Sequence, residues 1–287
     1  MRYILLSLLL TGSLSVYAQP CATGTSLGSS SNMFTNVVNS TMPVVADKDL
    51  NTVLFVHRNN ASAFGGSSGH LRYDLSTDGG TTWTNNQGVL NPLLSFQARY
   101  PQAVIYNPVG NTTPANAFVG YLAPTINGAL FQGYVNGVRQ LNGTGNTENY
   151  GQLPNTQTNV PRTIVKGAPG IFWSIDAINN GTQITGFRIF KGTWNGSTEI
   201  NWAVNNTITP TFNTAYSGVP QVGEYNIAFD PTGQIGWVSV LTHLTPGPVA
   251  YAFYPSFWHT TDGGVTWTGP EQVDLGQFNC IANNMAV

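Results

Sequence analysis

The octapeptide STDGGTTW spans residues 76–83, and nearly the same octapeptide, TTDGGVTW, returns at residues 260–267. Each copy begins with a hydroxyl side chain, places an Asp before two glycines and ends on a Trp. An Asp side chain in such a place bonds to the backbone of its own turn, and glycine supplies the positive φ that a tight turn needs. The octapeptide therefore predicts a turn, and we interpret Asp78 and Asp262 as structural residues rather than catalytic ones.

The two octapeptides belong to a longer repeat. A short apolar strand recurs at intervals of about sixty residues, as expected for an array of supersecondary units, and its copies start at Pro43, Pro101, Pro161 and Glu224. A turn rich in polar residues, Pro or Gly follows each copy, and then comes a second strand rich in β-branched and aromatic residues. These second strands read TVLFVHR, NAFVGYLA, GIFWSIDAI and IGWVSVLTHL.

The octapeptides fall at one place in the repeat, the turn between the third and fourth strands of a unit. Trp83 and Trp267 end them in the first and fourth units, and Trp202 holds the matching place in the third unit, which lacks the Asp and the glycine pair. The second unit has YVNGVRQL (134–141) there, and its Asn-Gly pair predicts a hairpin turn. The sequence thus predicts four-stranded units of an all-β fold.

Both octapeptides match the Asp-box, S/T-x-D-x-G-x-T-W, and on this motif the chain resembles the sialidase-like (BNR repeat) β-propellers. The resemblance implies that each box is a hairpin turn on the rim of a blade, with structural roles for Ser76, Asp78, Gly80, Trp83, Thr260, Asp262, Gly264 and Trp267. It covers residues 37–287 as four visible blades and the start of a fifth. Because relatives usually have six or seven blades, we expect an incomplete propeller, the N-terminal part of a longer protein.

The N-terminus predicts export. Residues 1–18 combine one Arg, an apolar core and small residues before Gln19, the pattern of a signal peptide, and residues 19–36 then form a lead segment. We expect a secreted or cell-surface protein without a membrane span. The run at 56–80 also resembles secreted propellers of Bacteroidetes-type bacteria, which commonly carry a sorting domain for type IX secretion. Cys21 and Cys280 either form a disulfide or remain separate thiols, and the sequence leaves both open.

Charge and composition narrow the range of ligands. Only 8% of the residues are charged and the net charge is -2, so no basic stripe suggests nucleic acid as a partner. The four His residues show no metal-ligand spacing, and we expect neither a metal nor a cofactor. The aromatic run YAFYPSFWHT (251–260) has two interpretations, stacking on sugars and packing in the core, and we favour the core.

The candidate binding residues come from the starts of the first strands. Arg99 and Arg162 lie there in successive units, and Glu224 and Tyr225 lie at that level in the fourth. First strands line the central channel of a propeller, so we predict a binding cluster of these four residues at the channel mouth; the alternative is ordinary charges on a rim. No catalytic residue is assigned, because the Arg-Ile-Pro motif that the resemblance to sialidases would require is absent.

From these observations we expect a non-catalytic propeller that binds a glycan or an extracellular protein. Two alternatives stay open. One is a sialidase-type exo-glycoside hydrolase whose remaining active-site residues lie in downstream blades. The other is a structural spacer within a larger adhesin, because a fold does not determine a function.

Overall fold

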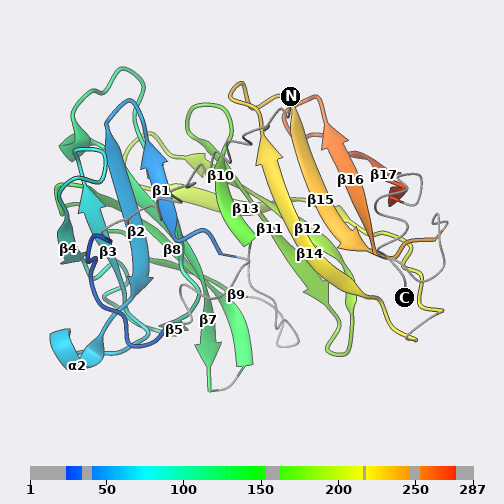
Figure 1. Cartoon of the computed structure of the whole chain (residues 1–287), viewed down its shortest axis with the longest axis horizontal. Helices are drawn as coiled ribbons and strands as arrows, with labels where there is room; N and C mark the ends of the chain where they lie inside the picture. Colours follow the sequence, from blue (N-terminus) through cyan, green and yellow to red (C-terminus); the bar gives the residue numbers. More distant parts are fainter. Residues whose placement is uncertain are drawn as a thin grey trace, which may run out of the picture.

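The structure is a computed structural model that describes residues 24–33, 41–128, 130–152, 162–215, 218–245 and 253–275. These residues form four antiparallel sheets, here called blades 1 to 4 (Figure 1). The predicted signal peptide, Cys21 and Cys280 lie outside the described residues. Within the described part of the chain, no helix is both long and apolar enough to cross a bilayer.

The strands follow one another in chain order within each blade. Blade 1 contains β1 (Val44–Asp47), β2 (Thr52–Arg58), β3 (Leu71–Ser76) and β4 (Thr84–Gln87). Blade 2 contains β5 (Gln97–Ala98), β6 (Gln102–Tyr106), β7 (Phe118–Asn127), β8 (Leu130–Gln140) and β9 (Asn149–Gln152), with both β5 and β6 paired to β7. Blade 3 contains β10 (Arg162–Lys166), β11 (Ile171–Asn179), β12 (Ile184–Trp194) and β13 (Ile200–Ile208). Blade 4 contains β14 (Val222–Phe229), β15 (Gly236–Thr242), β16 (Tyr254–Thr260) and β17 (Thr268–Gln272).

The predicted all-β fold is confirmed, and helical structure is confined to α2 (Ala61–Phe64) and η1 (Pro114–Asn116) among the described residues. Each predicted first strand and second strand is present, and β2 coincides with the predicted segment TVLFVHR. Burial alternates along β16, where every second residue from Tyr254 to Thr260 is buried. This period of two is what a strand with one face in the core requires.

The blades stack face to face, which gives the chain a β-propeller architecture. One apolar cluster joins blades 1 and 2, a second joins blades 2 and 3, and a third joins blades 3 and 4. In the third cluster, Trp173 and Phe187 of blade 3 pack with Ile227, Val238 and Trp258 of blade 4. The core is therefore a series of interfaces between neighbouring sheets.

The first strands of all four blades end around one cavity of about 750 Å³. In blade 2 the predicted first strand corresponds to β6. The cavity is lined by the last residues of β1, β6, β10 and β14, which are Asp47, Tyr106, Lys166 and Phe229. Lys166 Nζ lies 2.8 Å from Asp47 Oδ2 and links blade 3 to blade 1 across this end. The four strands therefore run in the same direction around a common centre, and their starts lie at the opposite end, which we call the mouth.

The hairpin predicted at Asn136-Gly137 is wrong, because β8 runs straight through this pair. The connection to β9 comes at residues 141–148, where Gly143 and Gly145 have positive φ. A Cβ built on Gly137 would lie 2.0 Å from the carbonyl oxygen of Thr147 and 2.5 Å from Oη of Tyr121. Gly137 thus allows a close approach inside a strand, the other common use of glycine in sheets.

The octapeptides form the turns between β3 and β4 and between β16 and β17. Thr82 donates to the Asp78 carboxylate from its backbone nitrogen at 2.8 Å and from its hydroxyl at 2.6 Å. Ser76 Oγ donates to Asp78 Oδ1 and accepts from the Gly80 nitrogen. The second turn repeats the pattern, with Thr260, Asp262, Gly264 and Thr266 in the corresponding places. The two indoles differ, since Trp83 donates to Gly80 within its own turn while Trp267 packs against the core between blades 3 and 4.

These hydrogen bonds hold the pKa of Asp78 and of Asp262 down to about 2, chiefly through the hydroxyl groups of Thr82 and Thr266. A carboxylate whose folded pKa lies below the unfolded value of about 3.9 adds stability above that value, and this stability is lost as the pH falls toward 2. A variant with Asp78→Asn and Asp262→Asn should therefore have a lower Tm than the wild type at pH 7. Melting curves at pH 7, 4 and 2 should show the difference shrinking at the lowest pH, and an unchanged difference there would contradict this account.

Candidate functional site

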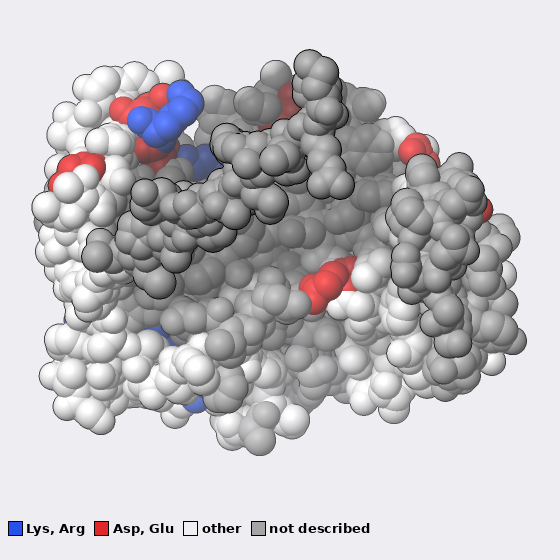
Figure 2. Space-filling model, in the orientation of Figure 1, with Lys and Arg blue, Asp and Glu red and all other residues white. Residues whose placement is uncertain are grey.

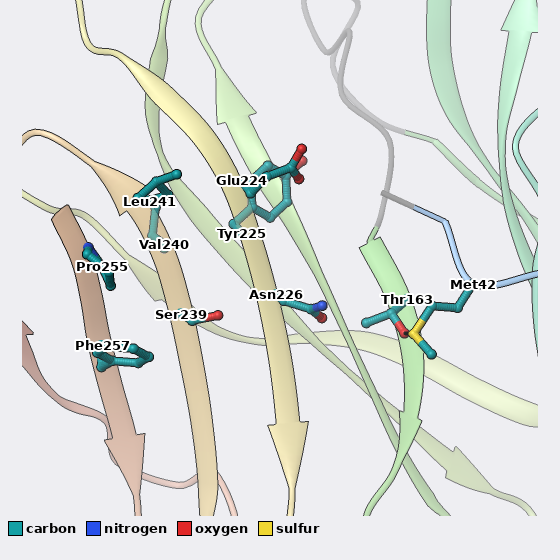
Figure 3. A pocket seen from close by; sticks show the side chains of 10 residues that line it. All are labelled: Met42, Thr163, Glu224, Tyr225, Asn226, Ser239, Val240, Leu241, Pro255 and Phe257. Atoms are coloured by element: carbon teal, nitrogen blue, oxygen red, sulfur yellow. Dashed lines mark hydrogen bonds between the residues drawn. The ribbon is translucent and has the colours of Figure 1, made fainter. Parts of the chain in front are cut away.

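A cavity of about 510 Å³ lies at the mouth, between β14 and the starts of β10 and β1. Figure 3 shows the side chains that line it: Met42, Thr163, Glu224, Tyr225, Asn226, Ser239, Val240, Leu241, Pro255 and Phe257. Thr163 Oγ1 lies 3.0 Å from Met42 Sδ, so blades 1 and 3 meet at one side of the cavity. The remaining lining residues come from blade 4, which places this mouth cavity where three blades converge.

Glu224 and Tyr225 both line the mouth cavity although they are neighbours on one strand. Neighbouring side chains normally point to opposite faces of a sheet. The pairing of β14 with β15 shifts register between Val222 and Tyr225, which marks a bulge at the start of β14. Burial still alternates from Glu224 to Ile227, so Glu224 lies on the outward face of blade 4 and Tyr225 on the face toward blade 3. The Glu224 side chain is exposed, whereas Tyr225 is only 6% exposed and its ring centroid lies 5.3 Å from that of Phe187.

A second irregularity borders the cavity at the start of β10. Thr163 has φ 49°, a left-handed conformation that a β-branched residue rarely adopts. The pairing of β10 with β11 also shifts register between Arg162 and Val165. Backbone strain of this kind tends to gather at functional sites, where the surrounding packing holds it. Two bulged first strands thus shape the wall of the mouth cavity.

The two predicted Arg residues lie at the same end but are placed differently. Arg162 opens β10 and its backbone pairs with Ile175, while its side chain lies outside the described part of the structure. Arg99 follows β5 and donates to the Ala98 carbonyl and to Gln97 Oε1, each at 2.8 Å. Arg99 is not among the residues that line the mouth cavity. Of the predicted cluster, Glu224 and Tyr225 thus line the mouth cavity and Arg99 does not.

Arg58, which the sequence analysis did not single out, is the neighbour of Arg99. Its guanidinium donates to the Ser68 carbonyl and to Ser68 Oγ, each at 2.9 Å. Burial, and secondly the charge of Arg99, lowers the pKa of Arg58 to about 10. The sequence does indicate the position of Arg58, because it ends the second strand TVLFVHR. A second strand runs antiparallel to the first, so its last residue lies at the mouth.

The sequence also did not predict a buried polar cluster that lies between blades 2 and 3. Asp176 of β11 has no exposed surface, and its Oδ2 accepts hydrogen bonds from Oη of Tyr134 on β8 and from Nη2 of Arg188 on β12. Burial raises the pKa of Asp176 despite the opposing effect of Arg188. Desolvation likewise raises the pKa of Tyr134. A lone Asp and a lone Arg within apolar strands were the signals that could have revealed this cluster.

The aromatic run at 251–260 places some residues in the core and one at the mouth cavity. Tyr254 and Trp258 are buried, as core packing requires. Phe257 is half-buried and lines the mouth cavity. Among the described residues, no group of three His, Cys, Asp or Glu side chains is placed to hold a metal ion.

The comparisons with known proteins do not assign the chain to a family. No family model matches the sequence, and no curated protein matches it either. A solved polysaccharide lyase of family PL25, an ulvan lyase, is similar in structure with a TM-score of 0.42 and 15% identity, over 82% of this chain and 57% of that one. The chain therefore spans a little over half the length of the ulvan lyase.

Two further solved structures show a similar degree of likeness. The GH43 endo-arabinanase from Bacillus licheniformis has a TM-score of 0.36 and 12% identity, over 80% of this chain and 78% of that one. The subtype N11 neuraminidase-like protein of A/flat-faced bat/Peru/033/2010 (H18N11) has a TM-score of 0.34 and 12% identity, over 75% and 59% of the two chains.

Proposed function

We propose that this chain is a secreted or cell-surface β-propeller module that binds a glycan at the mouth cavity without catalysing a reaction. One observation carries the proposal: the exposed Glu224 and the buried Tyr225, neighbours on β14, both line a single cavity of about 510 Å³. The cavity also presents the ring of Phe257 and the polar side chains of Asn226 and Ser239. Sugars offer apolar ring faces together with hydroxyl groups, and this combination of an aromatic face with hydrogen-bonding groups suits them.

Binding is the better-supported function because the described residues that line the cavity include a single carboxylate, Glu224. Most glycoside hydrolases place two carboxyl groups on either side of the scissile bond. The adjacency of Glu224 and Tyr225 keeps one alternative open, since sialidases depart from this scheme and use a Tyr nucleophile. The alternative function is thus a sialidase-type exo-glycoside hydrolase, with other residues supplied by further blades. A structural spacer within a larger adhesin is the second alternative.

Glu224→Gln should weaken glycan binding by about tenfold, because a charge-assisted hydrogen bond to a sugar hydroxyl becomes a neutral one. Retention on a panel of immobilised neutral and acidic oligosaccharides would identify the ligand, and titration of the best one would give the Kd. Asp49→Asn is the matched control, since Asp49 borders the cavity at the opposite end of the first strands. The control should bind like the wild type.

Three outcomes of this experiment differ in meaning. Equal binding by the wild type and Glu224→Gln would contradict a glycan site at the mouth cavity. Retention of no oligosaccharide by the wild type would support the spacer. Release of the fluorescent aglycone from a sialoside, lost on Tyr225→Phe, would support the hydrolase.

A further inference from the structure

The outward face of blade 4, turned away from blade 3, carries an exposed aromatic patch. We define this patch as Trp237, Phe257, His259 and Glu271. Their strands pair Trp237 with His259 and Phe257 with Glu271, and the alternation along β15 and β16 sets all four on one side of the sheet. Trp237 is 41% exposed, and its ring centroid lies 4.9 Å from that of His259 and 6.2 Å from that of Phe257.

The two faces of blade 4 differ in charge. The inner face packs against blade 3 through uncharged side chains such as Ile227, Val238 and Trp258. The outward face holds Glu271, whose side chain is 61% exposed and whose Oε1 lies 3.3 Å from Nδ1 of His259. That inner face also buries small polar side chains, Thr242, Ser256 and Thr260, but its strands place no charged side chain there. A carboxylate beside an exposed indole suits a partner that carries cationic side chains.

Charge is distributed unevenly along the whole chain. The sequence contains no Lys or Arg after Lys191, whereas six acidic residues follow it: Glu199, Glu224, Asp230, Asp262, Glu271 and Asp274. On the side of the molecule shown in Figure 2, the Lys and Arg side chains lie over the half that carries blades 1 and 2. Blade 4 therefore has no Lys or Arg of its own to place beside Glu271.

One buried carboxylate in the molecule shows how this chain satisfies such a group. Asp176, buried between blades 2 and 3, is contacted by the guanidinium of Arg188 from the neighbouring strand of its own blade. Arginine is the side chain best suited to such a place, since its planar head pairs with carboxylates and also stacks on aromatic rings. Trp is in turn the best aromatic partner for a cation. The patch therefore offers the two groups with which a guanidinium interacts most favourably, an indole and a carboxylate.

We propose that the outward face of blade 4 binds a basic protein surface, with Arg or Lys side chains stacked on Trp237 and paired with Glu271. The charge complementarity favours this partner over a second copy of the chain docked through the same face, because two such faces would repel each other. The patch adjoins the proposed glycan site at the mouth: Phe257 belongs to both, and Ser239 and Leu241 of the mouth cavity lie on the same face of β15 as Trp237. The test therefore uses Trp237 and Glu271 and leaves Phe257 unchanged.

Binding of the full chain to an immobilised oligoarginine peptide would test the proposal. The affinity should fall by about tenfold between about 0.05 and about 0.3 M salt, because exposed charges are screened. Trp237→Ala and the isosteric Glu271→Gln should each weaken binding about three- to tenfold. Val109→Ser is the control, since Val109 is 84% exposed and borders the cavity at the opposite end of the first strands. Melting curves would confirm that the variants fold.

Several outcomes would overturn the proposal. One is a wild type that does not bind oligoarginine, and another is wild-type affinity in both Trp237→Ala and Glu271→Gln. Concentration-dependent dimers that Trp237→Ala abolishes would assign the face to a second copy of the chain. Loss of oligosaccharide binding in Glu271→Gln, with peptide binding intact, would assign it to a glycan. Glu224→Gln should leave peptide binding within about twofold, which separates this proposal from that for the mouth cavity.

Discussion

Asp176→Ala is expected to lower the free energy of unfolding by about 3–5 kcal/mol, the usual cost of removing one partner from a buried ion pair. Asp176 has no exposed surface, and the Arg188 side chain that contacts it is 11% exposed. The substitution leaves the guanidinium without this carboxylate and removes the acceptor of the Tyr134 hydroxyl. Because Tyr134 lies in blade 2 and Asp176 in blade 3, the loss falls on the interface between two blades. Urea denaturation followed by fluorescence would measure the effect.

Two further variants separate the charge from the packing. Tyr134→Phe removes one hydrogen bond and should cost about 1–2 kcal/mol. Asp176→Leu combined with Arg188→Met replaces the ion pair by apolar side chains of similar size, and it should recover most of the stability that Asp176→Ala loses. A loss below about 1 kcal/mol in Asp176→Ala would show that the pair contributes little to the interface between the blades.

The repeat could be predicted from the sequence because its signals are local. Each turn needs residues with particular backbone preferences, such as the Asp and the glycines of the octapeptides, and those residues stand in the sequence where the turns form. The second strands are short apolar runs bounded by such turns, so their limits were clear, and β2 coincides with its predicted segment. The position of Glu224 and Tyr225 at the mouth end of the propeller also followed from the order of the strands alone.

The remaining features depend on residues that are far apart in the sequence. Tyr134 and Asp176 are separated by 42 positions, and only the stacking of blades 2 and 3 brings them together. Gly137 looked like a turn residue because its role in the strand depends on Thr147 and Tyr121, which approach it from neighbouring segments. The bulge between Val222 and Tyr225 has no residue signature in β14 either. Tertiary contacts override local preference at all these positions.

Trp173→Ala is expected to destabilise the protein by about 3–5 kcal/mol, as large-to-small substitutions of buried aromatic residues do. Trp173 lies on β11 of blade 3 with only 1% of its surface exposed. Its ring stacks on Phe229 of blade 4 at a centroid distance of 4.4 Å and an interplanar angle of 11°. Because each blade contacts mainly its neighbours, we expect blade 4 to lose its coupling to the rest and to unfold at a lower urea concentration. A single transition at the wild-type midpoint would contradict this.

A second substitution shows why the octapeptide of blade 4 must keep its second glycine. Gly264 has φ 82°, and a Cβ built on it would lie 2.4 Å from Cη2 of Trp173. Gly264→Ala should therefore combine backbone strain with a clash against the ring, whereas in the Trp173→Ala background only the strain remains. The double-mutant cycle should give a coupling of about 1–3 kcal/mol, the range for residues in direct contact. A coupling near zero would mean that Gly264 serves its own turn alone; the expected value would mean that it also makes room for the ring that joins blade 3 to blade 4.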